Sequence, residues 1–331
     1  MKKRIVDLGG AAAPILDIVS YGRSVGVAFT PTQRMLITRT VARTPEVMVK
    51  VSGGARTPRG VAQHLDYIGR KGDLGVELDT CEQLQGKNFD KVVVQDWDLD
   101  LEAHRRQDHH SIRGRRKPPK LVHNVIFSMP PGTSSKKVLT AVRKLATHEF
   151  ALKHRYAMVL HTDDAHPHVH LVVKAMSEQG RRLNIRKAML RDWRQQFAAY
   201  LREQGVAANA TERAVRGEIR TRKSDGLFRA MQRNVSVWQR KRLLDLATDV
   251  PGGTLESEAG KAVLMRTREQ VVAGWLAVSE RLQTAGDSHL AGRIRSFVAR
   301  MAPVRSEKEM LVDAARSTGR GGKIESMERT R

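Results

Sequence analysis

Four histidines lie within ten residues of one another, between His161 and His170. His168 and His170 are one residue apart on a predicted strand, so both imidazoles project from the same face of that strand. His161 ends the preceding predicted strand, and the turn through residues 162–167 can return it to the side of His168. Three neutral imidazoles with open coordination positions are typical of zinc, manganese or another transition ion rather than of magnesium. The spacing therefore predicts a metal site formed by His161, His168 and His170.

Two other polar residues in the same turn are candidates for supporting this site. Asp163 can accept a hydrogen bond from the outer nitrogen of a ligand imidazole and so fix the orientation of the ring. His166, which lies next to Pro167, is a candidate for supporting a ligand, for contacting a phosphate or for acting as a base.

Transesterification of a phosphodiester is one reaction that such a metal site supports, since it needs an oxygen nucleophile and a positive charge at the phosphate. A phenolate is a better leaving group than an alkoxide, so a tyrosyl–phosphate ester keeps enough free energy for the strand to be rejoined. The chain has four tyrosines. Tyr156 precedes an apolar strand and Tyr200 lies on the apolar face of a long predicted helix, which favours structural roles, and Tyr21 falls in no predicted element. Tyr67, near the end of a predicted helix, is the candidate nucleophile.

The charge of the chain predicts a polyanionic partner. There are 59 lysines and arginines against 35 aspartates and glutamates, a formal net charge of +24. Nucleic acid is favoured over an anionic membrane, because the sequence has no apolar run of spanning length and no basic amphipathic anchor. We therefore expect no membrane insertion. The basic residues around Tyr67 are candidate phosphate contacts: Arg56, Arg59, Arg70 and Lys71.

Cysteine usage narrows the chemistry further. Cys81 is the only cysteine, so an intramolecular disulfide and a cysteine-based metal cluster are both excluded. A single thiol fits a reducing cytoplasm.

The elements that would position these residues alternate between strands and helices. Strands are predicted over 47–51, 121–128, 156–162 and 169–175, and helices over 57–70, 134–150 and 185–204. The tight turn between the last two strands favours antiparallel pairing. We therefore predict an α+β fold with a central antiparallel sheet flanked by helices, followed by a helical C-terminal region.

The predicted organisation has three parts. Residues 1–44 form an N-terminal extension, residues 45–222 the catalytic domain, and residues 223–331 the helical C-terminal region with a flexible end. Within the catalytic domain, residues 73–117 show no clear pattern beyond a basic stretch, which we expect to be an exposed loop.

Three ordered motifs resemble those of the conjugative and mobilisation relaxases, which belong to the His-hydrophobe-His endonuclease superfamily. Residues 161–170 read H-x-D-x-x-H-P-H-x-H, like the third motif of that family. Leu65–Gly72 resembles the first motif, whose tyrosine is the nucleophile. His123–Thr133 resembles the second, whose serine, here Ser128, is implicated in holding DNA near the nick. The resemblance covers roughly residues 45–217 and is especially close to the plasmid P-type branch, which includes the T-DNA border endonuclease.

This resemblance implies a relaxase fold and a metal-dependent endonuclease that nicks one DNA strand at a transfer origin. Such an enzyme stays covalently bound to the 5′ end and religates it after conjugative transfer. The ion implied is Mg²⁺ or Mn²⁺. The partners implied are single-stranded DNA at the transfer origin, relaxosome accessory proteins and the coupling protein of a type IV secretion channel. The protein would act in the cytoplasm and be transferred to a recipient cell with the DNA.

Two features depart from the pattern of the family. Some 45 residues precede the first predicted strand, whereas the tyrosine of the relatives lies close to the N-terminus. In addition, no acidic residue matches a base for the tyrosine, because Asp66 would point away from Tyr67 on a helix.

Other functions use the same residue types. A rolling-circle replication initiator shares the histidines and the tyrosine, although the other motifs disfavour it. A metal hydrolase that activates water would form no covalent intermediate. A DNA-binding accessory protein with a degenerate site is disfavoured because the tyrosine and the three histidines are all present. Trapping of DNA on the protein separates such a hydrolase from an enzyme with a tyrosine nucleophile.

Overall fold

The computed structural model describes residues 17–23, 28–102, 118–218, 259–306 and 309. The chain divides into two compact units. The sheet unit contains Ala42–Ala210, and the helical unit combines Ile15–Val41 with Thr211–Arg331. The basic stretch expected near residues 104–117 and the expected flexible end lie outside the described residues.

One six-stranded sheet forms the centre of the sheet unit, in the strand order β1-β4-β6-β5-β2-β3. The strands are β1 (Met48–Gly53), β2 (Val76–Leu78), β3 (Gln83–Leu84), β4 (Val122–Ser128), β5 (Tyr156–His161) and β6 (His168–Lys174). Each pairing between these strands is antiparallel. The predicted α+β fold with a central antiparallel sheet is therefore confirmed.

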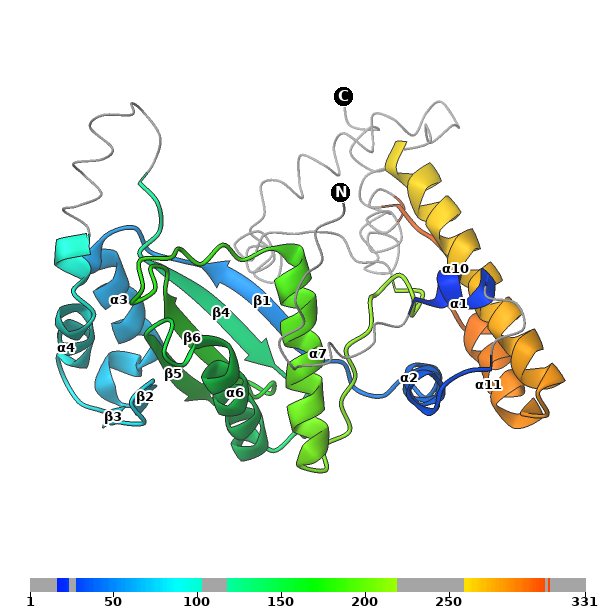
Figure 1. The fold of residues 1–331 in the computed structure, drawn as a ribbon, viewed down its shortest axis with the longest axis horizontal. Coiled ribbons are helices and arrows are strands. Elements are labelled where there is room, and N and C mark those ends of the chain that lie inside the picture. The colour runs from blue at the N-terminus through cyan, green and yellow to red at the C-terminus, as the bar shows by residue number, and fades with distance from the viewer. Residues whose placement is uncertain (1–16, 24–27, 103–117, 219–258, 307–308, 310–331) are drawn as a thin grey trace, which may run out of the picture. The chain divides into compact units, whose positions relative to one another are not determined.

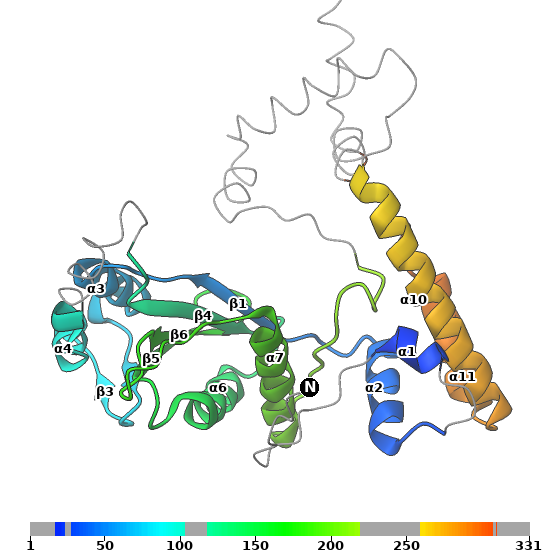
Figure 2. The ribbon, with the colours of Figure 1, turned by 45° about the horizontal axis from the view of Figure 1, so that its top comes forward.

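Helices cover both faces of this sheet, as Figures 1 and 2 show. They are α3 (Pro58–Ile68), α4 (Phe89–Asp96), α6 (Ser135–Phe150) and α7 (Lys187–Glu203), with a short 3₁₀ turn η1 (Arg70–Gly72) after α3. Alternation along β4 sends Val125 and Phe127 into the core under α6 and α7. It sends Val122 to the opposite face, where α3 and α4 bury it with Val159 and Val172.

Helix α3 begins where the sequence predicts it. The side chain of Thr57 accepts a hydrogen bond from the Gly60 N–H at 3.1 Å, and Pro58 occupies the first helical position. Three apolar residues at helical spacing are buried under it: Val61, Leu65 and Ile68. This buried side fixes the rotation of α3, so its polar residues face away from the core.

The same helix ends two residues earlier than predicted. Arg70 and Lys71 have φ values of +52° and +58°, which lie in the left-handed region and cannot continue a right-handed helix. Gly72 follows with φ of +95°, and a Cβ atom there would meet the carbonyl oxygen of Gly86 at 2.2 Å. The chain therefore turns sharply away at the end of α3.

Short elements occupy the stretch after α3 that gave no clear pattern. Strands β2 and β3 have only three and two residues, and α4 has eight. Periods of two or 3.6 residues cannot be recognised over such lengths, since a single alternation fits either. The apolar residues Val92–Val94 belong to α4.

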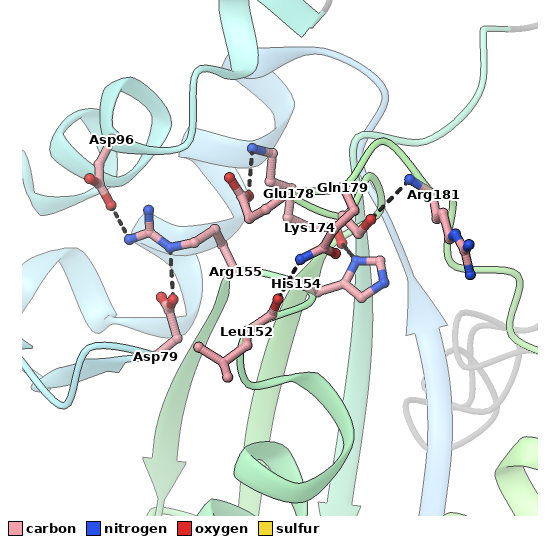
Figure 3. Close-up of polar contacts among 10 residues, drawn as sticks. Asp79, Asp96, Leu152, His154, Arg155, Lys174, Glu178, Gln179 and Arg181 are labelled. Atoms are coloured by element: carbon pink, nitrogen blue, oxygen red, sulfur yellow. Dashed lines mark hydrogen bonds and ion pairs between the residues drawn. The ribbon is translucent and has the colours of Figure 1, made fainter.

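An ion-pair network joins elements at one end of the sheet (Figure 3). Arg155, which precedes β5, binds Asp79 after β2 at 2.7 Å and also binds Asp96 at the end of α4. Nearby, the imidazole of His154 lies 2.9 Å from the Lys174 carbonyl oxygen, and Lys174 pairs with Glu178. Arg155 thus connects three segments that are distant in the sequence.

We expect Arg155→Ala to destabilise the sheet unit by about 1–3 kcal/mol, because a partly buried carboxylate would lose its partner. The Arg155 and Asp79 side chains are only 21% and 17% exposed, and the second carboxylate oxygen of Asp79 is buried without a hydrogen-bond partner. Lys144→Ala is the matched control, since Lys144 and Glu203 are both more than half exposed, and it should change the stability much less than Arg155→Ala. Urea denaturation of both variants measures the difference, and equal losses would contradict the prediction.

The helical unit has its own core. Its helices are α1 (Ile18–Arg23), α2 (Pro31–Val41), α10 (Ala259–Thr284) and α11 (Ser288–Ala299). Ile18 and Ile37 from the N-terminal part are buried together with Trp275 and Phe297 from the C-terminal part. Arg34 on α2 binds Asp287 at 2.7 Å, and Asp287 also caps the first turn of α11. The N-terminal segment therefore folds together with the C-terminal part into one unit.

No elements were predicted in the N-terminal extension, and the reason is physical. Helix α1 has six residues and α2 has four buried side chains among eleven, so neither carries a sustained apolar stripe. Their buried residues pack against helices more than 200 positions away, which a local pattern cannot show. The predicted domain boundaries at residues 44 and 222 stay predictions.

Candidate metal centre and nucleophile

The structure brings the three predicted ligands together. His161 and His168 are direct partners across β5 and β6, and His170 pairs with Val159 one step further along the same face. The ring centroids of the three imidazoles are separated by 4.5 to 5.1 Å. One nitrogen from each ring lies within 4.8 Å of the other two. This geometry follows from strand alternation and the antiparallel register, and it forms a cluster that can hold a divalent metal ion.

Backbone carbonyl groups fix which nitrogen two of these rings present. His161 Nε2 lies 2.6 Å from the Ile68 carbonyl oxygen, and because a carbonyl only accepts, Nε2 carries the proton and Nδ1 presents its lone pair. His168 Nδ1 lies 3.0 Å from the His166 carbonyl oxygen, which leaves Nε2 with the lone pair. A metal-bound histidine commonly donates its other ring N–H to a carbonyl group. The three imidazoles therefore fit a metal ion.

Burial favours the uncharged form of two of these imidazoles, His161 and His170. It is the main cause of the lowered pKa of His170, which falls to about 3, with His161 and His168 adding to the effect. Burial also lowers the pKa of His161. Neutral imidazole is the form that binds metal, so the lowered pKa of His161 and His170 favours their ligating form.

Tyr67 lies in the last turn of α3, on the side away from the core. Its side chain is 56% exposed, because Leu65 and Ile68 occupy the buried side of the helix. The next residue, Ile68, is the one whose carbonyl oxygen binds His161. Tyr67 therefore immediately precedes the residue whose backbone carbonyl group contacts the histidine cluster.

Two of the other three tyrosines lie in or against the core of the sheet unit, as the sequence suggests, and the third lies in the helical unit. Tyr156 is 4% exposed in the core. Tyr200 is partly buried against that core, and Tyr21 lies in the helical unit with its ring centroid 6.2 Å from that of Phe29. Among the described residues, Tyr67 is the one strongly exposed tyrosine.

Asp163 lies beside His161, although not at its outer nitrogen. An oxygen of Asp163 is 3.8 Å from His161 Nδ1, whereas the outer Nε2 is bound by the Ile68 carbonyl. Asp163 instead forms an ion pair with Arg70, and the hydrogen bond from that guanidinium lowers the pKa of the carboxyl group. Arg70 also approaches His161 Nδ1 to 3.4 Å, and its guanidinium lies 5.5 Å from the centre of the Tyr67 ring.

The remaining predicted site residues differ in their distance from the cluster. Ser128 is buried and pairs in register with His168, and His166 Nδ1 lies 3.3 Å from the Met129 carbonyl oxygen. Lys71 is exposed in the turn after α3. Arg59 lies at the other end of α3 from Tyr67, about 12 Å along the helix axis at 1.5 Å per residue, and Arg56 precedes the helix.

His64 and the Ile68 carbonyl are parts of the site that sequence reasoning missed. His64 lies one turn before Tyr67 on α3, its Nε2 is buried without a hydrogen-bond partner, and its charge contributes to lowering the pKa of His170. Its spacing of three residues from Tyr67 is a signal that could have placed it on that side of the helix. No sequence signal identifies the carbonyl group.

A half-buried histidine on the sheet face opposite the histidine cluster predicts a loss of stability in mild acid. His123 pairs with Val173, and burial, followed by Lys120, lowers its pKa to about 4. The unfolded chain binds this proton near pH 6.5, so the stabilisation is present above that pH and is lost as pH falls through about 4. Allowing for solvent screening, we expect about 1–2 kcal/mol.

The measurement is urea denaturation in EDTA between pH 7.5 and pH 4.5, comparing the wild type with His123→Gln. The variant cannot take up this proton, so its free energy of unfolding should depend less on pH. Parallel pH profiles for the two proteins would contradict the assignment.

Comparison with known proteins gives one consistent relationship. Residues 67–206 match the nuclease-domain profile of the relaxases described as MobA/VirD2-like. The chain is 27% identical over 190 residues to the T-DNA border endonuclease VirD2 of Rhizobium radiobacter, covering 52% of this chain and 43% of the relative. It is 25% identical over 224 residues to VirD2 of Agrobacterium fabrum strain C58, covering 63% and 49%.

A third VirD2, from Rhizobium rhizogenes, is 26% identical over 204 residues, with 57% of this chain and 45% of the relative covered. The chain thus spans less than half the length of the curated relatives it matches. Across the part of the chain that the structure describes, no helix is long and apolar enough to span a bilayer. The matched segment contains Tyr67, Ser128 and the three clustered histidines. Residues 67–206 of this chain are therefore similar to the nuclease domain of the MobA/VirD2-like relaxases.

Proposed function

We propose that this protein nicks one strand of DNA at a transfer origin by transesterification, with Tyr67 as the nucleophile, and rejoins the strand after transfer. The observation that carries the proposal is the hydrogen bond between His161 and the carbonyl group of Ile68. It joins the helix end that presents an exposed tyrosine to a cluster of three potential metal ligands. This contact supports a site in which the Tyr67 phenol and the three histidines act on the same phosphate.

The reaction is balanced without a co-reactant. A bond forms between Tyr67 Oη and the phosphorus atom while the bond from phosphorus to the 3′ oxygen breaks. The phenol proton passes to solvent, and the 3′ oxygen takes a proton from solvent to leave a free hydroxyl group. The 5′ end stays esterified to Tyr67. Attack by a 3′ hydroxyl group on this ester reverses the step and rejoins the strand.

His161, His168 and His170 would hold the metal ion, which we propose to be Mg²⁺ or Mn²⁺ as in the family. When bound, such an ion neutralises negative charge that develops on the phosphate oxygens. Ser128 is proposed to hold DNA near the nick, and the basic residues Arg56, Arg59 and Lys71 to contact phosphates. The net charge of +24 supports binding of single-stranded DNA.

The biological setting is proposed from the same resemblance. Relaxosome accessory proteins and a type IV coupling protein are the expected partners. The protein would act in the cytoplasm and accompany the transferred strand into the recipient cell.

Capture of DNA on the protein tests the proposal. Single-stranded oligonucleotides tiled across the DNA that flanks the gene are labelled at the 3′ end and incubated with the protein and Mn²⁺. We expect one of them to yield a labelled covalent adduct that resists boiling in detergent, together with an unlabelled fragment that ends in a 3′ hydroxyl group. Cleavage that leaves both products free of protein would instead identify a metal hydrolase.

A further inference from the structure

The turn that follows Tyr67 has an unusual backbone for its sequence. Arg70 and Lys71 are consecutive non-glycine residues whose backbone lies in the left-handed region, at φ of +52° and +58°. This conformation is unfavourable for residues other than glycine. It persists here because the turn is held from outside: Gly72 packs against Gly86, whose N–H donates to the Gly72 carbonyl at 3.0 Å. The turn directs the Arg70 side chain back toward the histidine cluster.

The guanidinium group of Arg70 contacts both parts of the site. It forms an ion pair with Asp163, which lies in the turn between the strands that carry His161 and His168. It also lies 3.4 Å from His161 Nδ1 and 5.5 Å from the centre of the Tyr67 ring. One planar group thus connects the helix end that carries the tyrosine to the loop that joins the ligands.

Stabilisation of the fold does not explain this arrangement. The side chains of Arg70 and Asp163 are 37% and 52% exposed, and ion pairs this exposed contribute little to stability. An unfavourable backbone conformation that supports an exposed ion pair is more typical of a functional site than of a structural contact.

We propose that Arg70 is a positioning residue for the nicking reaction, acting through Asp163 and Tyr67. Its contact with Asp163 fixes the guanidinium beside the phenol ring, and so sets the position of Tyr67 Oη relative to the histidine cluster. This inference rests on the proposed function and assigns Arg70 a role different from a phosphate contact. A phosphate contact changes how tightly DNA binds. A positioning residue changes how fast bound DNA is cleaved.

Single-turnover nicking separates these two roles, with the rate constant at saturating DNA and the DNA concentration for half-maximal rate measured for each variant. Arg70→Gln is expected to lower the rate constant about 30- to 100-fold and to change the half-saturating concentration about threefold or less. Arg70→Lys keeps the charge but not the planar fork that reaches two partners, so it should recover less than about a third of the lost rate.

Lys71→Gln is the matched control, because it removes one positive charge from the neighbouring residue with the same backbone conformation. It should raise the half-saturating concentration a few-fold, as loss of a phosphate contact would, with a smaller effect on the rate constant than Arg70→Gln. Circular dichroism melting of all variants verifies that they are folded, which the exposure of both side chains leads us to expect.

Asp163→Asn completes a double-mutant cycle. If Arg70 acts through Asp163, the variant with both Arg70→Gln and Asp163→Asn should be about as slow as Arg70→Gln alone. Multiplied losses in the double variant, full recovery of the rate by Arg70→Lys, or a change in half-saturation without a change in rate would each overturn the proposal. Failure of the wild type to form an adduct would instead overturn the proposed function, so the two failures are distinguishable.

Discussion

Tyr67→Phe is expected to abolish formation of the covalent adduct and to reduce nicking by at least about 10³-fold. The substitution removes one oxygen atom from a side chain that is 56% exposed, so folding, metal binding and binding of single-stranded DNA should all survive. In the proposed reaction the phenol oxygen forms the new bond to phosphorus, and phenylalanine offers no substitute nucleophile. Adduct formation is measured with labelled oligonucleotide under saturating DNA, where a binding defect cannot reduce the signal.

The product of the wild type decides between a nucleophile and a tyrosine that only contacts DNA. Mass spectrometry of the digested adduct should find a nucleotide on the peptide that contains Tyr67. Tyr200→Phe is the matched control, since Tyr200 lies in the same unit, partly buried against the core, and should retain nicking. A nucleotide attached to another tyrosine, or nicking without any adduct, would be incompatible with the assignment.

His170→Ala is expected to weaken Mn²⁺ binding by at least about 100-fold and to remove nicking at micromolar metal. The loss of one of three imidazoles leaves an incomplete set of ligands, and even partners behind a ligand are worth 10- to 100-fold in affinity. His170 is the most informative of the three, because its strand neighbours are held by backbone pairing and, among the described contacts, its ring makes no hydrogen bond to α3. Isothermal titration calorimetry on protein dialysed against EDTA measures the affinity directly.

His161→Ala should behave differently from His170→Ala. It removes a ligand and also releases the carbonyl oxygen of Ile68, so the end of α3 loses its attachment to the cluster. High Mn²⁺ should therefore restore less activity to His161→Ala than to His170→Ala. His148→Ala, an exposed histidine on α6, serves as the control for nonspecific metal binding. An unchanged Mn²⁺ affinity in His170→Ala would remove that residue from the metal site.

The histidine cluster was predictable from sequence because it depends on local rules. Alternation on β6 sets His168 and His170 on one face, and a six-residue connection limits where His161 can lie. Helix α3 was predictable for the same reason, since Thr57 and Pro58 define its start and the apolar spacing defines its buried side. The end of α3 was not, because the left-handed residues Arg70 and Lys71 depend on packing between Gly72 and Gly86.

The contacts that connect the cluster to Tyr67 could not be read from the sequence. Arg70 and Asp163 are 93 residues apart, and the partner of His161 is a backbone carbonyl group that every residue possesses. Sequence reasoning therefore predicted candidate reacting groups but interpreted Arg70 as a phosphate contact. It also left α1 and α2 unassigned, because their partners come from the other end of the chain.

The helical unit is built from two segments that are far apart in the sequence, Ile15–Val41 and Thr211–Arg331. The ribosome therefore makes its two parts at different times. Arg34 and its partner Asp287 are separated by 253 positions, so at about 5–20 residues per second a ribosome needs roughly 10–50 s to make the second after the first. During that interval the sheet unit can fold, whereas Leu36 and Ile37 have no core to enter. The nascent N-terminal segment therefore exposes apolar surface for longest, and chaperones that recognise such segments are expected to bind there first.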